Sequence, residues 1–251
     1  MSALRILHLT DTHILAEPGQ TLYGVDTYGR TAALLDHVRR TAGAPDLAVL
    51  SGDCVDTPSA AAYGCLKALL AEHLAAPCLI LPGNHDDPML LKAMFPDAAV
   101  PQAIRDNWLF VLLDSTRPDS PSGMLSDAEL ARLEATLAEH PAQHALIALH
   151  HHPLPVGSPW MDAMGLAEDS AARLLEILRR SGNVRLVLCG HAHQEHAWTR
   201  HGVPLFVTPS STVQFQPGCD AFTLDRLPPG CRWLELCPDG GFSSRLIWLP
   251  E

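Results

Sequence analysis

Five short polar motifs, rich in aspartate, asparagine and histidine, each follow an apolar run of the chain. They are Asp11-Thr12-His13, Gly52-Asp53, Gly83-Asn84-His85-Asp86, His150-His151-His152-Pro153 and Gly190-His191-Ala192-His193. Carboxylate oxygens, amide oxygens and imidazole nitrogens are ligands that suit Mn, Fe or Zn, and the motifs contain no thiolate. One such motif alone would indicate little, because each pattern is common in turns. The five together predict a metal-dependent site.

The spacing inside the motifs supports this interpretation. Asp-x-His and His-x-His place alternate side chains on the same side of an extended segment, so both can face one metal region. Glycine precedes Asp53, Asn84 and His191, and glycine permits a sharp exit from a strand. A carboxylate shared by two cations can hold them ~3.5–4 Å apart, the spacing of two-metal phosphoester hydrolysis.

The elements that must position these motifs alternate along the first two thirds of the chain. Apolar runs predict strands at 4–10, 46–50, 78–81, 108–113, 144–149 and 184–188. Helical spacing of Ala, Leu and Val predicts helices at 30–40, 59–74, 126–139 and 167–179, and Ser126 with Glu129 forms a capping box. Because the carboxyl ends of strands in an α/β sheet line one crevice, we expect the five motifs to converge there. The loop 14–28 and the segment 157–166 are expected to wall the pocket.

The last quarter of the chain has a different character. Short strands are predicted at 198–200, 203–207, 221–224, 232–236 and 244–248. This pattern indicates an antiparallel meander rather than another βα unit. There is no linker or repeat, so we expect one domain over residues 1–251.

Composition and charge exclude several classes of protein. The 251 residues are 47% hydrophobic and 18% charged, which is typical of a folded globular chain. Lys+Arg 17 against Asp+Glu 28 gives a net charge of −11, which disfavours a nucleic acid polymer as partner. Seven cysteines without a C-x-x-C pair argue against a disulfide framework and a thiolate zinc site. No apolar run approaches the ~20 residues of a membrane helix, and the start lacks a signal-peptide pattern. A cytoplasmic protein without a membrane partner is expected.

In their order along the chain, the five motifs resemble those of the calcineurin-like metallophosphoesterases, and the resemblance covers essentially the whole sequence. The chain is also similar to the bacterial class III 3′,5′-cyclic-AMP phosphodiesterases. That similarity lies in Ser59-Ala60-Ala61-Ala62-Tyr63, Leu81-Pro82-Gly83-Asn84-His85-Asp86, His150-His151-His152-Pro153-Leu154-Pro155, Thr208-Pro209-Ser210 and Val213-Gln214-Phe215. It implies a four-layer αββα sandwich of the α/β class, with two mixed sheets face to face and helices outside.

The resemblance also implies two divalent metal ions, Fe and/or Mn, with Zn as a further option. The implied ligands of the first metal are Asp11, His13, Asp53 and His193. Those of the second are Asp53, Asn84, His150 and His191, so Asp53 bridges. His85 is implied to bind phosphate and to protonate the leaving oxygen, with Asn84 and His193 also close to substrate.

Three assignments stay open at this stage. The His-x-Pro spacing points to His151 as the strand-end ligand, whereas a gapless match to relatives points to His150. We favour His150, because it directly follows the strand, and this leaves His152 to contact solvent or substrate. Asp56 is either a solvated loop carboxylate or a hydrogen-bond partner that orients His85 as an acid, and related phosphatases with G-D-x-x-D favour the second role. Asp86 could cap a helix that begins near Pro88.

The implied reaction is hydrolysis of 3′,5′-cyclic AMP to 5′-AMP through a metal-bridging hydroxide, with a small cyclic nucleotide or phosphodiester as partner. A homodimer is compatible with the sequence. The alternatives are other small phosphodiesters, such as glycerophosphodiesters or 2′,3′-cyclic nucleotides, a protein phosphatase, and a nuclease, which the acidic charge disfavours. A binding scaffold that has lost its ligands would show gaps in the ligand set, and the sequence shows none.

Overall fold

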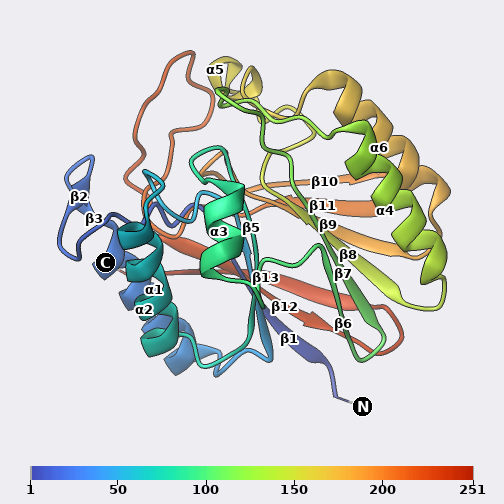
Figure 1. The fold of residues 1–251 in the computed structure, drawn as a ribbon, viewed down its shortest axis with the longest axis horizontal. Helices are drawn as coiled ribbons and strands as arrows, with labels where there is room; N and C mark the ends of the chain where they lie inside the picture. Colours follow the sequence, from blue (N-terminus) through green and yellow to red (C-terminus); the bar gives the residue numbers. More distant parts are fainter. Residues whose placement is uncertain (1, 251) are drawn as a thin grey trace.

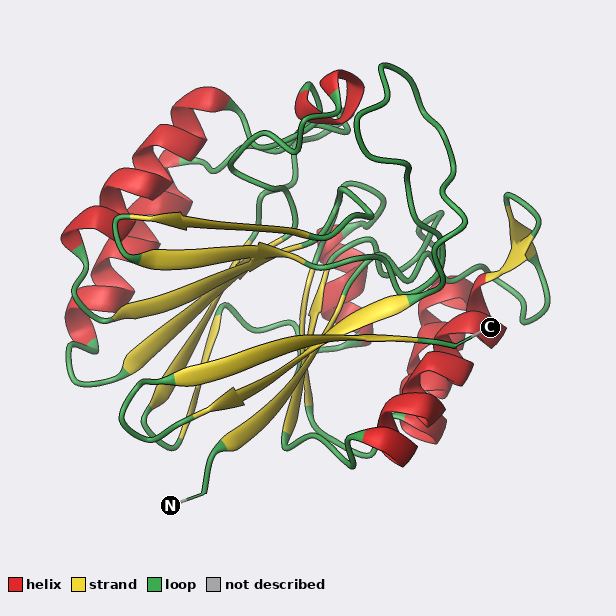
Figure 2. Ribbon diagram, turned by 180° about the vertical axis from the view of Figure 1, so that it is seen from behind, coloured by secondary structure: helices red, strands yellow, loops and turns green. Residues whose placement is uncertain are grey.

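Two mixed β-sheets pack face to face, and helices cover both outer faces (Figures 1 and 2). The computed structural model describes residues 2–250. The first sheet has the order β13-β12-β1-β4-β5, with bounds Phe242–Trp248, Gly230–Leu236, Leu4–Leu9, Leu47–Ser51 and Cys78–Leu81. The second has the order β10-β11-β9-β8-β7-β6, with bounds His196–Arg200, Val203–Val207, Val184–Cys189, His144–Leu149, Trp108–Leu113 and Gln102–Arg105. The expected four-layer sandwich is confirmed.

The helices lie where their apolar faces can be buried. On the first sheet these are α1 (Thr27–Thr41), α2 (Ala60–His73) and α3 (Pro88–Met94), and on the second they are α4 (Asp127–Glu139) and α6 (Glu168–Arg180). A short helix, α5 (Pro159–Asp162), lies at the top of Figure 1, and a hairpin of β2 (Thr21–Leu22) and β3 (Val25–Asp26) projects at the left. The sequence did not predict α5, β2, β3 or β6.

Burial on both faces explains why the inner strands are apolar throughout. All six residues of β7 and all five of β4 are buried. Because strand side chains alternate between faces, Phe110 packs between the two sheets while Leu109 packs against the helices of the second sheet. Ile6 and Leu7 divide in the same way on the first sheet. Strands covered on both sides read as continuous hydrophobic runs, which is how they were recognised in the sequence.

Two helices begin directly after a side chain that caps their first turn, and one of these caps differs from the expected residue. Ser126 caps α4 by accepting a hydrogen bond from the Glu129 amide, as the capping box predicts. The cap of α3 is Asp87, which accepts from the amides of Met89 and Leu90. The expectation that Asp86 caps this helix is wrong, because its carboxylate is buried and turned toward the site described below.

The C-terminal strands do not form a single meander. The pair β10 and β11 joins the second sheet, where β11 runs parallel to β9. In the first sheet β12 pairs antiparallel with β1, and β13 pairs antiparallel with β12. The expected strand at 221–224 is reduced to one isolated bridge between Phe215 and Leu224.

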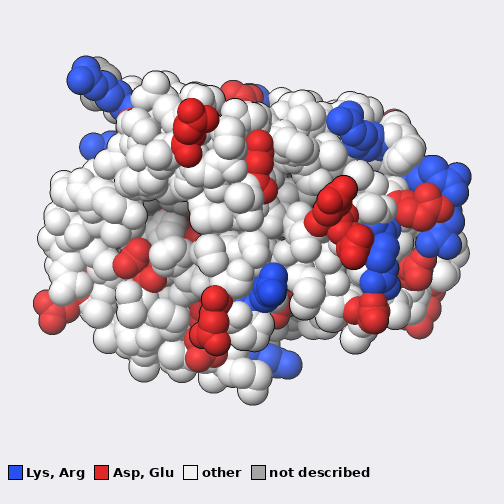
Figure 3. Space-filling model, turned by 90° about the horizontal axis from the view of Figure 1, so that it is seen from above, with Lys and Arg blue, Asp and Glu red and all other residues white. Residues whose placement is uncertain are grey.

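Charged side chains are unevenly spread over the face seen from above (Figure 3). In this view a hollow opens in a mostly uncharged surface, with acidic side chains nearby and no continuous basic patch around it. Among residues 2–250, no helix is both long and apolar enough to cross a membrane.

A buried histidine between the sheets should make stability depend on pH. His8 lies 2.7 Å from Ser51 Oγ and 2.8 Å from Thr208 Oγ1, and burial together with the charge of Arg232 lowers its pKa to about 3. In the unfolded chain its pKa is about 6.5. Between these values only the unfolded state binds the proton, so the free energy of unfolding falls as pH drops from 6.5 toward 3. In His8→Asn this slope should be shallower, by up to about 1.4 kcal/mol per pH unit.

Urea unfolding of both proteins at several pH values between 4 and 7 measures the slope. Equal slopes for His8→Asn and the unsubstituted chain would show that His8 makes no such contribution.

Candidate active site

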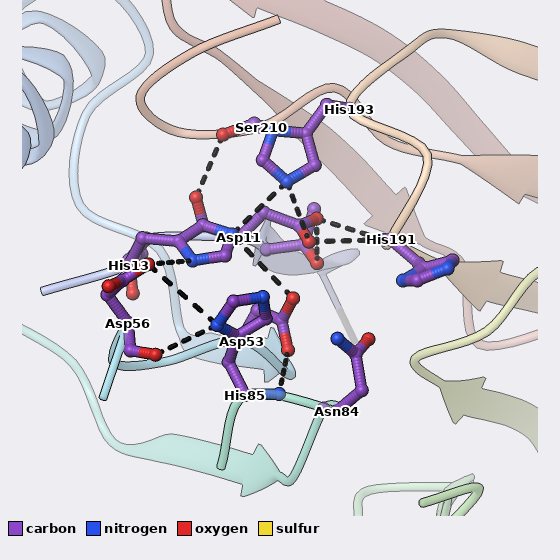
Figure 4. Close-up of polar contacts among 12 residues, drawn as sticks. Asp11, His13, Asp53, Asp56, Asn84, His85, His191, His193 and Ser210 are labelled. Carbon is purple, nitrogen blue, oxygen red and sulfur yellow. Dashed lines mark hydrogen bonds and ion pairs between the residues drawn. The ribbon is translucent and has the colours of Figure 1, made fainter. Parts of the chain in front are cut away.

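All five polar motifs lie at the carboxyl ends of strands. Those that follow β1, β4 and β5 come from the first sheet, and those that follow β8 and β9 come from the second. The site therefore forms where corresponding edges of the two sheets meet. Figure 4 shows side chains from these separate segments pointing toward one another. The predicted convergence of the motifs is confirmed.

The backbone at this edge adopts conformations that are rare for residues with a side chain. Asp11, His13, Asp53, His191 and His193 all have positive φ, between 42° and 69°. Each such residue costs on the order of 1–3 kcal/mol, and such conformations cluster at functional sites. Main-chain hydrogen bonds maintain them, since the amide of Asp11 donates to the carbonyl of Gly52 and that of His13 to the carbonyl of Asp53.

The three glycines act in two different ways. Gly52 has φ +93°, as expected of a sharp exit from the strand. Gly83 and Gly190 do not have positive φ. They allow close approach, because a Cβ at Gly83 would overlap the Asp53 carboxylate and one at Gly190 would overlap Thr10 Oγ1.

The first group of predicted ligands is compact and buried. His193 Nε2 lies 3.3 Å from Asp11 Oδ1 and 3.2 Å from His13 Nε2. His13 Nε2 in turn lies 3.6 Å from Asp53 Oδ2. Four side chains from three motifs thus direct polar atoms at one point, and none is more than 4% exposed.

The second group lies on the other side of Asp53. His150 Nε2 is 3.4 Å from Asp53 Oδ1, 3.2 Å from Asn84 Oδ1 and 3.3 Å from His191 Nδ1. The two oxygens of the Asp53 carboxylate therefore face different groups. This is the arrangement expected of a bridging ligand.

The outer ring nitrogens fix which atom faces the centre. His150 Nδ1 donates to the carbonyl of Ser51 at 2.8 Å, and His193 Nδ1 donates to that of Val213 at 2.7 Å. Each neutral ring then presents the lone pair of Nε2 to the cluster. At His150 this lone pair faces the oxygens of Asp53 and Asn84. All three atoms are hydrogen-bond acceptors, so no proton lies between them when the ring is neutral.

This donor set fits divalent cations. Burial alone would lower the pKa of His150, but the carboxylates of Asp53 and Asp11 outweigh burial and raise the pKa to about 9. Without a metal the cluster thus attracts a proton to the point where the acceptors meet. A cation would replace that proton and neutralise the surplus negative charge.

The structure separates the three neighbouring histidines. His151 lies beside the cluster, with a ring nitrogen within 4.8 Å of those of His150 and His191, but both of its nitrogens are engaged elsewhere, Nδ1 2.8 Å from Ser115 Oγ and Nε2 3.2 Å from the carbonyl of Pro121. This geometry favours His150 as the strand-end ligand. The expected solvent contact of His152 is wrong, because its side chain is 2% exposed and its Nδ1 donates to the carbonyl of Leu154.

His85 is held by Asp56, but not by its carboxylate. His85 Nδ1 donates to the main-chain carbonyl of Asp56 at 2.8 Å, whereas Asp56 Oδ1 is 3.8 Å from that nitrogen. The expected hydrogen bond from His85 to the Asp56 carboxylate is therefore wrong. Burial opposes a charge on His85, yet the Asp53 carboxylate and the Asp56 carbonyl outweigh burial and raise the pKa of His85. The ring lines the pocket, and within residues 2–250 its Nε2 makes no hydrogen bond.

The Asp56 carboxylate lies closer to a predicted metal ligand, with Oδ1 3.5 Å from His13 Nδ1. This contact with His13 holds the pKa of Asp56 below its usual range. We expect Asp56→Asn to lower metal affinity by about 10- to 100-fold, because outer partners orient ligand histidines, while excess metal restores turnover. Metal titration followed by activity tests this. An unchanged affinity with a shifted pH–rate profile would instead return Asp56 to a role at His85.

Asp86 is a site residue whose role the sequence did not reveal. Its buried carboxylate accepts hydrogen bonds from the amides of Gly83 and Cys54 and from Tyr63 Oη, at 2.9–3.0 Å. It thereby ties together the loops that carry Asp53 and Asn84. Burial and the nearby Asp53 raise the pKa of Asp86 to about 6. The only signal in the sequence was its place at the end of the Gly-Asn-His-Asp motif.

Ser210 is a second addition, because its Oγ donates to the carbonyl of Asp11 at 2.8 Å (Figure 4).

A pocket of about 160 Å³ opens directly on these residues. His85, Asn84 and His193 form part of its polar side. Leu22 and Tyr23 from the loop 14–28, and Trp160, Met161 and Met164 from the segment 157–166, line other parts of it. Both segments were expected to wall the pocket, and this prediction is confirmed.

Several known proteins that this chain resembles are named as phosphodiesterases or phosphatases. The calcineurin-like phosphoesterase family matches residues 4–195. A 3′,5′-cyclic adenosine monophosphate phosphodiesterase of Escherichia coli (strain K12) is 40% identical over 99% of this chain and 90% of its own length. The corresponding enzyme of Pseudomonas aeruginosa is 37% identical over 95% of this chain and 88% of its own. A dimetal phosphatase from Danio rerio shares the fold over the full length of both chains, with a TM-score of 0.67 at 16% identity.

Proposed function

The chain belongs to the calcineurin-like phosphoesterase family, and on that basis we propose that it hydrolyses 3′,5′-cyclic AMP to 5′-AMP. The observation that carries the proposal is the pair of His/Asp clusters joined by Asp53 beside an open pocket. Relatives named as 3′,5′-cyclic AMP phosphodiesterases match nearly the full chain at 32–40% identity. The net charge of −11 argues against a polymeric nucleic acid as substrate.

We infer that the two clusters hold one divalent metal ion each. Asp11, His13, Asp53 and His193 would hold the first, and Asp53, Asn84, His150 and His191 the second. Nitrogen and oxygen donors without thiolate support Fe or Mn, with Zn as a further option. When bound, two such cations would polarise the phosphoryl oxygens and supply hydroxide from water near neutral pH.

The protein's own groups account for the remaining steps. Asn84 and His193 lie beside the pocket, where they can position the phosphodiester group. Opening the ring breaks the bond between phosphorus and the 3′ oxygen, and that oxygen must gain a proton to leave as an alcohol. His85 Nε2 is placed to donate it, since Nδ1 is engaged by the Asp56 carbonyl. We also propose that residues 1–251 form one domain, because β12 near the C-terminus pairs with β1.

A substrate panel tests the proposed function. Protein stripped with a chelator should be inactive, and Mn²⁺ or Fe²⁺ should restore hydrolysis of 3′,5′-cyclic AMP in preference to 2′,3′-cyclic AMP and glycerophosphodiesters. Turnover of the other diesters without 3′,5′-cyclic AMP would assign a different substrate. Full activity of thoroughly stripped protein would overturn the metal requirement.

A further inference from the structure

The pocket has a second wall that the phosphodiester chemistry does not use. Four aromatic residues form it, Tyr23, Trp160, Phe215 and Phe222, which we call the aromatic wall. Phe222 contacts the other three, with ring centroids 5.1 Å from Tyr23, 5.8 Å from Trp160 and 5.1 Å from Phe215. Phe215 also stacks on His193 at 4.0 Å with the rings 8° from parallel. The wall therefore runs without a break from a predicted metal ligand to the pocket rim.

Tyr23 reaches this wall from an unfavourable backbone position. Leu22 pairs with Val25, so Tyr23 and Gly24 form a two-residue hairpin turn, with φ 52° and 78°. Such a turn needs positive φ at both positions, and Asn or Asp is preferred at the first. Tyrosine is a poor choice there, and its side chain is not rescued by burial, since it is 55% exposed.

A second hairpin in the same chain shows the contrast. His201 and Gly202 connect β10 and β11 with φ 54° and 80°, which is the same turn. Histidine is among the residues enriched at positive φ, whereas tyrosine is not. Strain that persists beside a pocket points to function. An aromatic ring at the tip of the first hairpin lines the pocket, where it can contact a molecule that enters.

We propose that the aromatic wall is a subsite for the nucleobase of the substrate, with Tyr23 at its rim as a specificity-determining residue. This rests on the proposed function. Bases stack on aromatic side chains whatever their sequence, and the wall carries no charged group that would select a different substituent.

The test compares substrates with and without a base. For Tyr23→Asn, we expect the ratio of kcat/KM for 3′,5′-cyclic AMP over base-free ribose 3′,5′-cyclic phosphate to fall about tenfold, mainly through KM, because stacking is lost. Asparagine is preferred at this turn position, so the variant should keep its Tm and unfolding cannot explain the loss. Tyr23→Phe retains a ring and should keep the ratio. His201→Asn, the matched turn away from the pocket, should also keep it.

The outcomes separate the subsite from the proposed function. An unchanged ratio in Tyr23→Asn would overturn the subsite, as would a loss of equal size in His201→Asn. A selective loss on glycerophosphocholine instead would assign the wall to a quaternary ammonium group. An unsubstituted protein that leaves 3′,5′-cyclic AMP untouched would overturn the proposed function itself. In that case the aromatic wall can still be tested with adenosine as an inhibitor of the hydrolysis of an aryl phosphodiester. Equal inhibition of Tyr23→Asn and of the unsubstituted protein would count against the subsite.

Discussion

Replacing Asp53 with alanine is expected to lower kcat/KM by about 10⁴-fold and to remove both metal ions. The Asp53 carboxylate is 2% exposed and faces His13 through one oxygen and His150 through the other. Each bound cation would stabilise the transition state by several kcal/mol, so the loss of two would cost about 6 kcal/mol. Asp53 Oδ1 also accepts a hydrogen bond from the amide of His85 at 2.9 Å, so the loop that carries the predicted acid loses a support.

Metal content by mass spectrometry and turnover of 3′,5′-cyclic AMP measure the effect. Asp46→Ala is a matched control, because it removes a carboxylate that pairs with Arg5 at the surface, where such pairs contribute about 0–1 kcal/mol. It should retain both metals and full activity. A clean loss of only one metal from Asp53→Ala, with activity recovered in excess Mn²⁺, would mean that Asp53 does not bridge.

The sequence predicted the strands and the order of the site motifs because both depend on local patterns. Strands covered on two faces are apolar throughout, so β4, β7 and β8 stood out as runs, and polar residues could follow only where each strand ended. The convergence of the five motifs then followed from a general property of α/β sheets. No pair of distant residues had to be matched for this inference.

What the sequence did not reveal depends on distant pairing and side-chain direction. The strand β12 has the same alternation whether it pairs with β11 or with β1, and the observed partner is more than 200 residues away, as in Leu4 with Leu236. The sequence alone also could not show which histidine of the run 150–152 faces Asp53. Only tertiary contacts direct His151 toward Ser115 and His150 toward Asp53. The spacing of Asp53 and Asp56 was interpreted as placing the Asp56 carboxylate on His85, but the main-chain carbonyl of Asp56 makes that contact.

Removal of the predicted acid should affect substrates according to their leaving groups. His85→Ala is expected to lower kcat for 3′,5′-cyclic AMP by about 10²- to 10⁴-fold, the usual contribution of general acid catalysis. The departing 3′ oxygen would otherwise leave as an alkoxide, which is a poor leaving group. Bis(4-nitrophenyl) phosphate releases an aryl oxide that needs no proton, so its hydrolysis should fall much less. The geometry supports this role, since His85 faces the pocket and its Nδ1 is already fixed on the Asp56 carbonyl.

The comparison of the two substrates distinguishes proton donation from phosphate binding. If His85 only binds the phosphate group, which both substrates carry, the losses on the cyclic and the aryl ester should be equal. His85→Asn sharpens the test, because the amide can donate a hydrogen bond to phosphate but cannot release a proton. It should restore part of the aryl ester activity and none of the loss on the cyclic ester. Because the residue holds no predicted metal, metal content should stay at two ions in both variants, so a fall in metal content would show that His85 supports the clusters instead.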